Sequence, residues 1–437
     1  MKNLQKRLKG VWCRLLRAEI LKVFSLTSLS TFIKMLTGFV TTKAVSVFVG
    51  PAGIALVGQL QNFSSILMSL SNGGISNGIV KYVAEHKDNK EKLREYMCSS
   101  FTLTILCSFV CALFLIIANK ELGDWVFNDT KYGFVFIAFG ISITLYSVNI
   151  LLISILNGLK QFRKYVIVNI FGSIIGMVFT VSLVFLLGIS GALIAVVTYQ
   201  SVVWVITYFM VRNEWWLNLS NFRLVWNKIV ISKLAKYSVM AIVTAVITPL
   251  IQMMIRNHVI EKISIDAAGY WEGMNRLSSA FIVFVSTSFA VYYLPKLSES
   301  KTKLELKHEI YKMFVFITPI VLIMFLIMFL LRIPIINLLY TEEFNPMKEL
   351  FLPQFIGDYI KIVAWVLSYI LLAKSMMKEY LVLEITTPII YLVAALILVN
   401  YYGVVGIVYS YIISIIFYLA VLIFIFRDLL KPSVYGK

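Results

Sequence analysis

Long apolar segments recur along the chain, and they constrain its fold more than any other feature. An α-helix needs about 20 apolar residues to cross the hydrocarbon core of a bilayer. The chain carries twelve such runs, at residues 23–49, 55–83, 96–118, 132–157, 165–187, 191–211, 233–256, 269–296, 308–331, 351–374, 379–400 and 404–426. Only 14% of the 437 residues are charged, whereas a soluble domain is about a quarter charged. The sequence therefore predicts an all-α, polytopic membrane protein.

The distribution of Lys and Arg predicts the orientation of these spans. Basic residues are enriched in cytoplasmic loops. Of the 40 Lys and Arg, 30 fall on the side that holds both termini and four lie inside the apolar runs. The other side holds six, namely Lys120, Lys131, Arg256, Lys262, Arg332 and Lys348. Arg256 is the last residue of the run 233–256 and is counted here at the outer boundary. We therefore expect both termini in the cytoplasm, and the net charge of +18 to face anionic lipid rather than nucleic acid.

Two basic segments are expected at the membrane surface. Leucines at helical spacing among Lys and Arg in residues 4–16 predict an interfacial amphipathic helix, with a disordered tail as the alternative. Residues 212–232 carry Trp215, Trp216 and Trp226 among basic residues, which is typical of a membrane-surface linker. The expected division is a surface segment 1–21, a six-helix lobe 22–211, a linker 212–232, a six-helix lobe 233–427 and a tail 428–437.

A shift of 213 residues aligns polar positions of the two halves. Lys43 then meets Arg256, and Gln59 meets Glu272. The few identities do not prove duplication, but they favour two lobes in parallel orientation. Such repeats commonly hold a substrate site between them near the middle of the membrane.

Charged side chains inside the apolar runs are the main candidates for function. They are Lys34, Lys43, Arg256, Glu272, Arg276, Asp358 and Lys361. A charge at the centre of a membrane helix costs at least about 3 kcal/mol and usually faces a bundle interior or a hydrated cavity. Basic residues outnumber acidic ones in this set, which favours a path for a polar, anionic substance.

Helical geometry separates these charges. Lys34 lies about 17 Å into the first run, near the bilayer midplane; it faces a hydrated cavity or pairs with a buried acid. Lys43 is nine residues later and half a turn out of phase. We expect it near the outer mouth with Arg256, less central to recognition, unless it snorkels to the interface.

Two couples of opposite charge share a helix face. Glu272 and Arg276 are four residues apart, and Asp358 and Lys361 are three apart, spacings that allow ion pairs. They are either structural pairs or sites where an anionic substrate competes for Arg276 or Lys361. In the second case the freed acid could take up a proton.

Glycine-rich motifs mark two further positions. Gly50-Pro51-Ala52-Gly53 predicts a tight turn between the first two spans. We place Asn72-Gly73-Gly74-Ile75-Ser76-Asn77-Gly78 inside the second span, where small residues permit close packing and the asparagines could bind sugar hydroxyls.

Enzyme chemistry and metal binding are not expected. His86, His258 and His308 are far apart and lack ligand spacing, so we predict neither a metal site nor a cofactor. No nucleophile–base set or phosphate loop is present in the sequence.

Several motifs together resemble a known family. They are Gly50-Pro51-Ala52-Gly53, the stretch from Asn72 to Glu85, Trp271-Glu272-Gly273, the stretch from Ser288 to Pro295, and Gly357-Asp358 with Lys361. Over residues 22–426 the chain resembles the Wzx-type flippases of bacterial polysaccharide synthesis, such as O-antigen translocases. These belong to the multidrug/oligosaccharidyl-lipid/polysaccharide exporter superfamily.

This resemblance implies about 12 transmembrane helices in two six-helix lobes around a central cavity. It implies an inner-membrane protein that flips an undecaprenyl-diphosphate-linked oligosaccharide to the outer leaflet, with a polysaccharide polymerase and a chain-length regulator as possible partners. A diphosphate needs cations on its path, and Lys34, Arg276 and Lys361 are candidates. Polar partners for the sugars would be Gln59, Gln61, Asn62, Asn72 and Tyr270.

Three other functions fit the sequence less well. A multidrug exporter of the same superfamily typically takes organic cations and should carry mainly acids in its cavity. A peptidoglycan-precursor flippase usually has two further helices. A membrane glycosyltransferase or polymerase should carry catalytic acids in a large outer loop, but the largest outer loop, residues 332–350, has only Glu342, Glu343 and Glu349.

Overall fold

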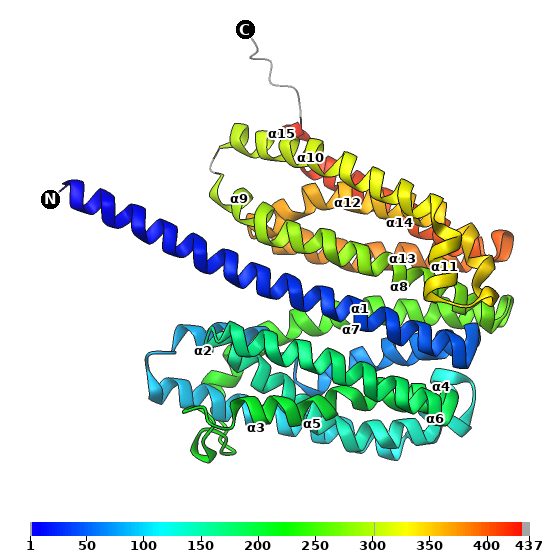
Figure 1. Cartoon of the computed structure of the whole chain (residues 1–437), viewed down its shortest axis with the longest axis horizontal. Helices are drawn as coiled ribbons and strands as arrows, with labels where there is room; N and C mark the ends of the chain where they lie inside the picture. Colours follow the sequence, from blue (N-terminus) through cyan, green and yellow to red (C-terminus); the bar gives the residue numbers. More distant parts are fainter. Residues whose placement is uncertain (1, 301, 431–437) are drawn as a thin grey trace, which may run out of the picture. The chain divides into compact units, whose positions relative to one another are not determined.

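The structure, a computed structural model, describes the backbone of residues 2–300 and 302–430 (Figure 1). Side chains are described for these residues except at 2–26, 219, 236, 237, 239, 240, 288, 290 and 291. All regular elements in the described residues are helices, which confirms the predicted all-α class. The amphipathic character expected of residues 1–21 depends on side chains outside the described ones, and residues 431–437 of the expected tail also lie outside the described residues.

The chain forms two compact units. Unit 1 holds residues 1–44 and 64–245, and unit 2 holds residues 45–63 and 246–437. Two helices pass from one unit to the other, α1 (Lys2–Ser71) and α7 (Lys228–Lys262). The predicted boundaries of the two six-helix lobes stay a prediction.

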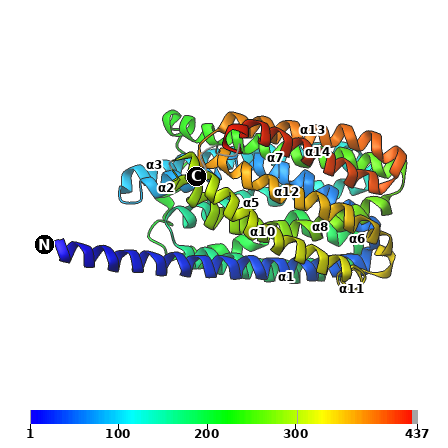
Figure 2. The same cartoon turned by 90° about the horizontal axis from the view of Figure 1, so that it is seen from above.

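Besides its parts of α1 and α7, unit 1 contains α2 (Ser76–Glu85), α3 (Lys90–Ile117), α4 (Asn119–Phe127), η1 (Thr130–Tyr132), α5 (Gly133–Gly158), α6 (Phe162–Val211) and η2 (Leu219–Asn221). The central helix is α5, which packs against α2, α3 and α6. In both views the first part of α1 extends past the ends of the other helices of this unit (Figures 1 and 2).

Unit 2 is built around α12, which packs against α8, α9, α10, α13 and α14. Its elements are α8 (Ile265–Ser288), η3 (Phe289–Tyr293), α9 (Leu294–Glu299), α10 (Lys303–Leu330), α11 (Arg332–Leu339), η4 (Glu342–Leu350), α12 (Phe351–Ala373), α13 (Met377–Tyr402), α14 (Val404–Ile425) and α15 (Arg427–Leu430).

Glycines interrupt the two longest helices. Gly50 in α1 has φ 69° and ψ −167°, and Gly188 in α6 has φ 55° and ψ −129°. A positive φ is open to glycine at little cost, and Pro51 can follow because the first turn of a helix needs no donor there. The turn predicted at Gly50–Gly53 is therefore confirmed, and the break in α6 falls between the predicted spans 165–187 and 191–211.

Nine of the described helices are long and apolar enough to cross a membrane, so the chain is a multi-pass membrane protein. α1 and α6 would each cross twice if their two parts count separately. α8 is not among the nine, because Asp266, Glu272 and Arg276 lower its apolar character. The count of twelve spans stays a prediction.

The prediction that residues 55–83 form one continuous helix is wrong, because the Asn72–Gly78 motif breaks it. α1 ends at Ser71, and α2 begins at Ser76. Gly73 and Gly74 have φ values of 65° and 64°. The side-chain amide of Asn72 donates to Ser76 Oγ at 2.9 Å across this break. A run of apolar residues cannot reveal such a break, because it depends on backbone dihedrals.

The segment between α6 and α7 is also only partly as expected. Trp215 and Trp226 are exposed, as a membrane-surface linker requires, but Trp216 is completely buried. Trp216 packs in a core with Val211, Val230 and Leu234. The linker is therefore folded against unit 1.

Candidate functional site

Two arginines of unit 2 share one carboxylate. Arg256 lies near the end of α7, and Glu272 and Arg276 lie on α8. Arg256 Nη2 is 2.5 Å from Glu272 Oε2, and Arg276 Nε is 3.0 Å from Glu272 Oε1. Among the described residues, Glu272 is the only acid that pairs with either arginine. The cluster therefore carries one positive charge more than it carries negative charge.

Amide side chains complete this cluster from the second part of α1. Gln59 Oε1 accepts a hydrogen bond from Arg256 Nη1 at 2.9 Å, and Gln59 Nε2 donates to Asn257 Oδ1 at 2.7 Å. Gln61 Oε1 accepts from Arg276 Nη2 at 2.8 Å. An amide oxygen satisfies guanidinium donors without adding negative charge, so the excess positive charge remains.

The two arginines differ in accessibility. The Arg256 side chain is 0% exposed and its guanidinium lies 5.3 Å from the centre of the Trp271 ring. The Arg276 side chain is 18% exposed. Arg256 is thus a sequestered cation that holds Glu272, whereas Arg276 is the cation that a ligand can reach.

Close helix packing makes the cluster possible. A Cβ added to Gly58 would lie 2.4 Å from Cδ of Glu272. A Cβ on Gly269 would lie 2.1 Å from the carbonyl oxygen of Pro51. Both distances are far below van der Waals contact, so these two glycines let α8 approach the second part of α1 and give the Glu272 carboxylate its place.

The predicted Glu272–Arg276 pair is confirmed, but the expected separation of Arg256 from it is wrong. Arg256 binds the same carboxylate and is fully buried. The four-residue spacing reveals a pair within one helix. A contact between α7 and α8 depends on tertiary packing, which spacing alone does not give.

The predicted Asp358–Lys361 pair does not form. Asp358 on α12 is 0% exposed and accepts hydrogen bonds from Ser278 Oγ at 2.6 Å, from Tyr411 Oη at 3.1 Å and from Gln354 Nε2 at 3.1 Å. Three neutral donors satisfy this carboxylate, so it does not need the lysine.

Lys361 instead lies against aromatic rings. Its Nζ is 5.6 Å from the centre of the Trp365 ring and 5.8 Å from that of Tyr411. It also interacts electrostatically with Asp358 and with Glu384 of α13. Glu384 was missed in the sequence, although its place inside the apolar run 379–400 was a sufficient signal.

The remaining predicted residues are dispersed. Lys34, in unit 1, is exposed, and none of the ion pairs between described residues involves it. Its two expected roles, in a hydrated cavity or beside a buried acid, stay predictions. Lys43 is half-buried in the same unit, and Asn62 is half-buried in unit 2. Asn72 is buried and serves the break between α1 and α2.

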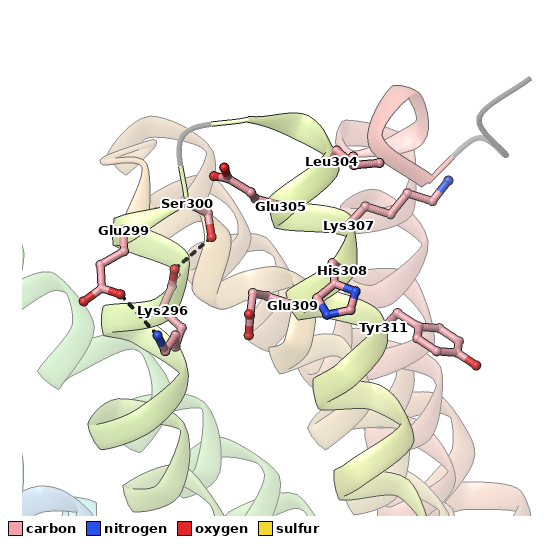
Figure 3. A pocket seen from close by; sticks show the side chains of 9 residues that line it. All are labelled: Lys296, Glu299, Ser300, Leu304, Glu305, Lys307, His308, Glu309 and Tyr311. Carbon is pink, nitrogen blue, oxygen red and sulfur yellow. Dashed lines mark hydrogen bonds and ion pairs between the residues drawn. The ribbon is translucent and has the colours of Figure 1, made fainter. Parts of the chain in front are cut away.

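A pocket of about 840 Å³ lies elsewhere in unit 2, where the chain passes from α9 to α10 (Figure 3). It is lined by Lys296, Glu299, Ser300, Leu304, Glu305, Lys307, His308, Glu309 and Tyr311. Lys296 pairs with Glu299 at 3.3 Å. The lining carries both signs of charge and contains none of the predicted residues. No group of His, Cys, Asp or Glu in the described part of the chain is arranged to hold a metal ion.

Comparisons with known proteins agree on family and fold. The model of the family described as polysaccharide biosynthesis protein matches residues 20–301. The lipid III flippase of Escherichia coli (strain K12) is 29% identical over 393 residues, which cover 90% of this chain and 94% of that protein, and the lipid III flippase of Shigella flexneri matches equally.

Solved structures of transporters share the fold. An inward-facing multidrug resistance MATE family transporter of the MOP superfamily has a TM-score of 0.76 at 14% identity, covering 92% of this chain and 96% of that one. The lipid II flippase MurJ, in an inward closed conformation, has a TM-score of 0.70 at 15% identity, covering 92% and 87%. These matched proteins are named as flippases or transporters, which is consistent with the prediction that the chain is not an enzyme.

Proposed function

Since the chain belongs to the family of polysaccharide biosynthesis proteins, we propose that it flips a lipid-linked oligosaccharide across the bacterial inner membrane. The substrate class is that of the flippases to which it is similar over almost its whole length. The finer proposal is an undecaprenyl-diphosphate carrier moving from the inner to the outer leaflet. Both termini then lie in the cytoplasm, as the 30 basic residues on that side favour.

The observation that carries this proposal is the excess positive charge of the Arg256–Glu272–Arg276 cluster. A diphosphate crossing the membrane needs a cation at depth, since water is absent there to stabilise it. The planar guanidinium can bind two phosphate oxygens at once. Arg276 is the arginine of the cluster that remains partly exposed.

Glu272 acts in this proposal as an internal stand-in for the substrate anion. Without ligand it neutralises Arg276, and Gln61 occupies a further donor of the same guanidinium. A diphosphate replaces the carboxylate at Arg276, while Glu272 keeps its bond to Arg256. No buried acid is left without a partner at any stage, which limits the cost of the exchange.

Roles for the other predicted residues are also proposed. Lys34 and Lys361 are proposed as further cations for the diphosphate, Lys43 and Asp358 as further charges that take part in transport, and Asn62, Asn72 and Gln59 as polar groups that bind sugar. A polysaccharide polymerase and a chain-length regulator remain proposed partners. The two six-helix lobes belong to the same proposal.

Complementation tests this function. A strain that lacks its own flippase should recover surface polysaccharide when it expresses the chain. Arg276→Ala should abolish recovery at an unchanged protein level, and Arg276→Lys should restore only part, because an ammonium cannot bind two oxygens in one plane. Arg332→Ala is the matched control, since among the described residues Arg332 contacts Phe329, three positions earlier in the chain, and no acid. Full recovery by Arg276→Ala would refute the role of the cluster.

A further inference from the structure

The segment between α6 and α7 presents large apolar side chains to the outside of unit 1. Trp215 is 54% exposed, Leu224 69%, Trp226 59% and Ile229 69%. We call these four residues the linker face. All four lie within residues 215–229, and so many exposed large apolar side chains in one short segment are suited to an interaction.

The linker face sits on a fixed backbone. Thr102 Oγ1 donates to the carbonyl oxygen of Val225 at 3.1 Å and accepts from Val225 N at 2.9 Å. Arg94 Nε donates to the carbonyl oxygen of Ser220 at 3.0 Å. Trp216 anchors the segment in the core of unit 1. These contacts fix the backbone of the segment that carries the exposed side chains.

Basic side chains flank the face, and one acid of α3, Glu95, accepts a hydrogen bond from Asn227 beside it. Arg212, Arg223 and Lys228 are exposed beside it. Glu214 is the only acid in residues 212–229, and its carboxylate already accepts hydrogen bonds from Lys164 and, at 2.7 Å, from Gln161. An incoming ligand therefore meets three exposed cations whose charge no acid of the segment offsets.

We propose that the linker face is a binding surface for the anionic lipids of the adjoining leaflet. The segment joins two helices that can each cross the membrane, α6 and α7, so it leaves and re-enters the bilayer at the same surface. Tryptophan favours the level of the lipid headgroups, and basic side chains near the surface are attracted to anionic lipids. The surface holds the linker, and with it unit 1, at a set depth. This inference does not depend on the substrate of the protein.

Binding of a labelled anionic lipid tests the charged half of the proposal. The purified full-length chain in zwitterionic nanodiscs would be titrated with fluorescent phosphatidylglycerol. Each basic residue near a membrane surface contributes about 1 kcal/mol, which corresponds to a factor of about five in affinity. The double variant Arg223→Gln/Lys228→Gln should therefore bind at least tenfold more weakly than the wild type. Lys120→Gln/Lys348→Gln removes two exposed lysines elsewhere and should bind like the wild type; equal affinity in all three proteins overturns the proposal.

Fluorescence quenching tests the apolar half. Brominated lipids quench a tryptophan only where it enters the bilayer. Trp215→Phe/Trp226→Phe should remove part of the quenching seen in the wild type, because these two side chains are exposed on the face. Unchanged quenching would mean that the face does not touch lipid and is free for another partner, which would also overturn the proposal.

Discussion

Glu272 governs the electrostatics of the candidate site, because two arginines depend on it. Arg256 is completely buried, and its ion pair with Glu272 is its only neutralising contact among the described residues. Removing one partner of a buried ion pair leaves an uncompensated charge, which typically costs about 3–5 kcal/mol. The loss is smaller for a partner that water can reach, as it can reach Arg276.

These differences predict unequal effects of two substitutions. Glu272→Gln should lower the free energy of unfolding by about 3 kcal/mol. Arg276→Gln should lower it by clearly less, because Glu272 still neutralises Arg256. Thermal unfolding of both purified variants in the same detergent measures this, and equal losses would contradict the shared-carboxylate arrangement.

The contact between Gly58 and Glu272 predicts a steric effect at the same site. Gly58→Ala should reduce stability by about 1–3 kcal/mol and reduce complementation, because the new Cβ meets the Glu272 carboxyl group. Gly38→Ala is a matched control in the same helix, since nothing lies within 4 Å of its added Cβ. Wild-type behaviour of both variants would show that the close approach does not matter.

Charged residues illustrate what sequence could predict at this scale. The Glu272–Arg276 pair follows from spacing alone, because both residues lie on one helix face. Arg256 joins that pair through contact between α7 and α8, and Asp358 finds Ser278 and Tyr411 on other helices. Sequence spacing does not contain these contacts.

At the scale of the element, the length of an apolar run predicted a helix well where the helix ends in a polar loop. The run 404–426 corresponds to α14, and the run 351–374 to α12. The same signal missed the break at Gly73 and Gly74, because apolar residues continue on both sides of it. The dihedral freedom of glycine decides the structure there.

The stability of the linker between α6 and α7 should depend on pH through Glu214. Burial raises the pKa of Glu214, but hydrogen bonds from Lys164 and Gln161 outweigh this and hold the pKa below its ordinary value of 4.5. A lowered folded-state pKa contributes stability above the unfolded-state value, and this contribution is lost as pH falls through the folded-state pKa.

Glu214→Gln should therefore remove part of the acid sensitivity. The wild type should be more stable than this variant at neutral pH, and the difference should shrink as the pH falls below 4.5. Melting temperatures measured from pH 7 downward would show this convergence. A difference that stays constant over that range would show that the carboxylate charge has no part in holding the linker.

At the scale of the whole molecule, the excess of basic residues on one side predicts a single orientation in the membrane. A cysteine placed at Lys348 should react with a membrane-impermeant maleimide in intact cells, and one placed at Arg223 should react only after lysis. Both positions are exposed, so accessibility differs through the membrane alone. The assay uses a background without the four native cysteines, and the reverse pattern would contradict the predicted orientation.

In the proposed function, Arg276 meets the anionic headgroup of a lipid-linked oligosaccharide. Mass spectrometry of the lipids that co-purify with the chain from its native strain measures this binding. We expect an undecaprenyl-linked glycan with the wild type, strongly reduced with Arg276→Ala and unchanged with Arg332→Ala. Absence of such a glycolipid from the wild type, or its full retention by Arg276→Ala, would contradict the proposed role of Arg276.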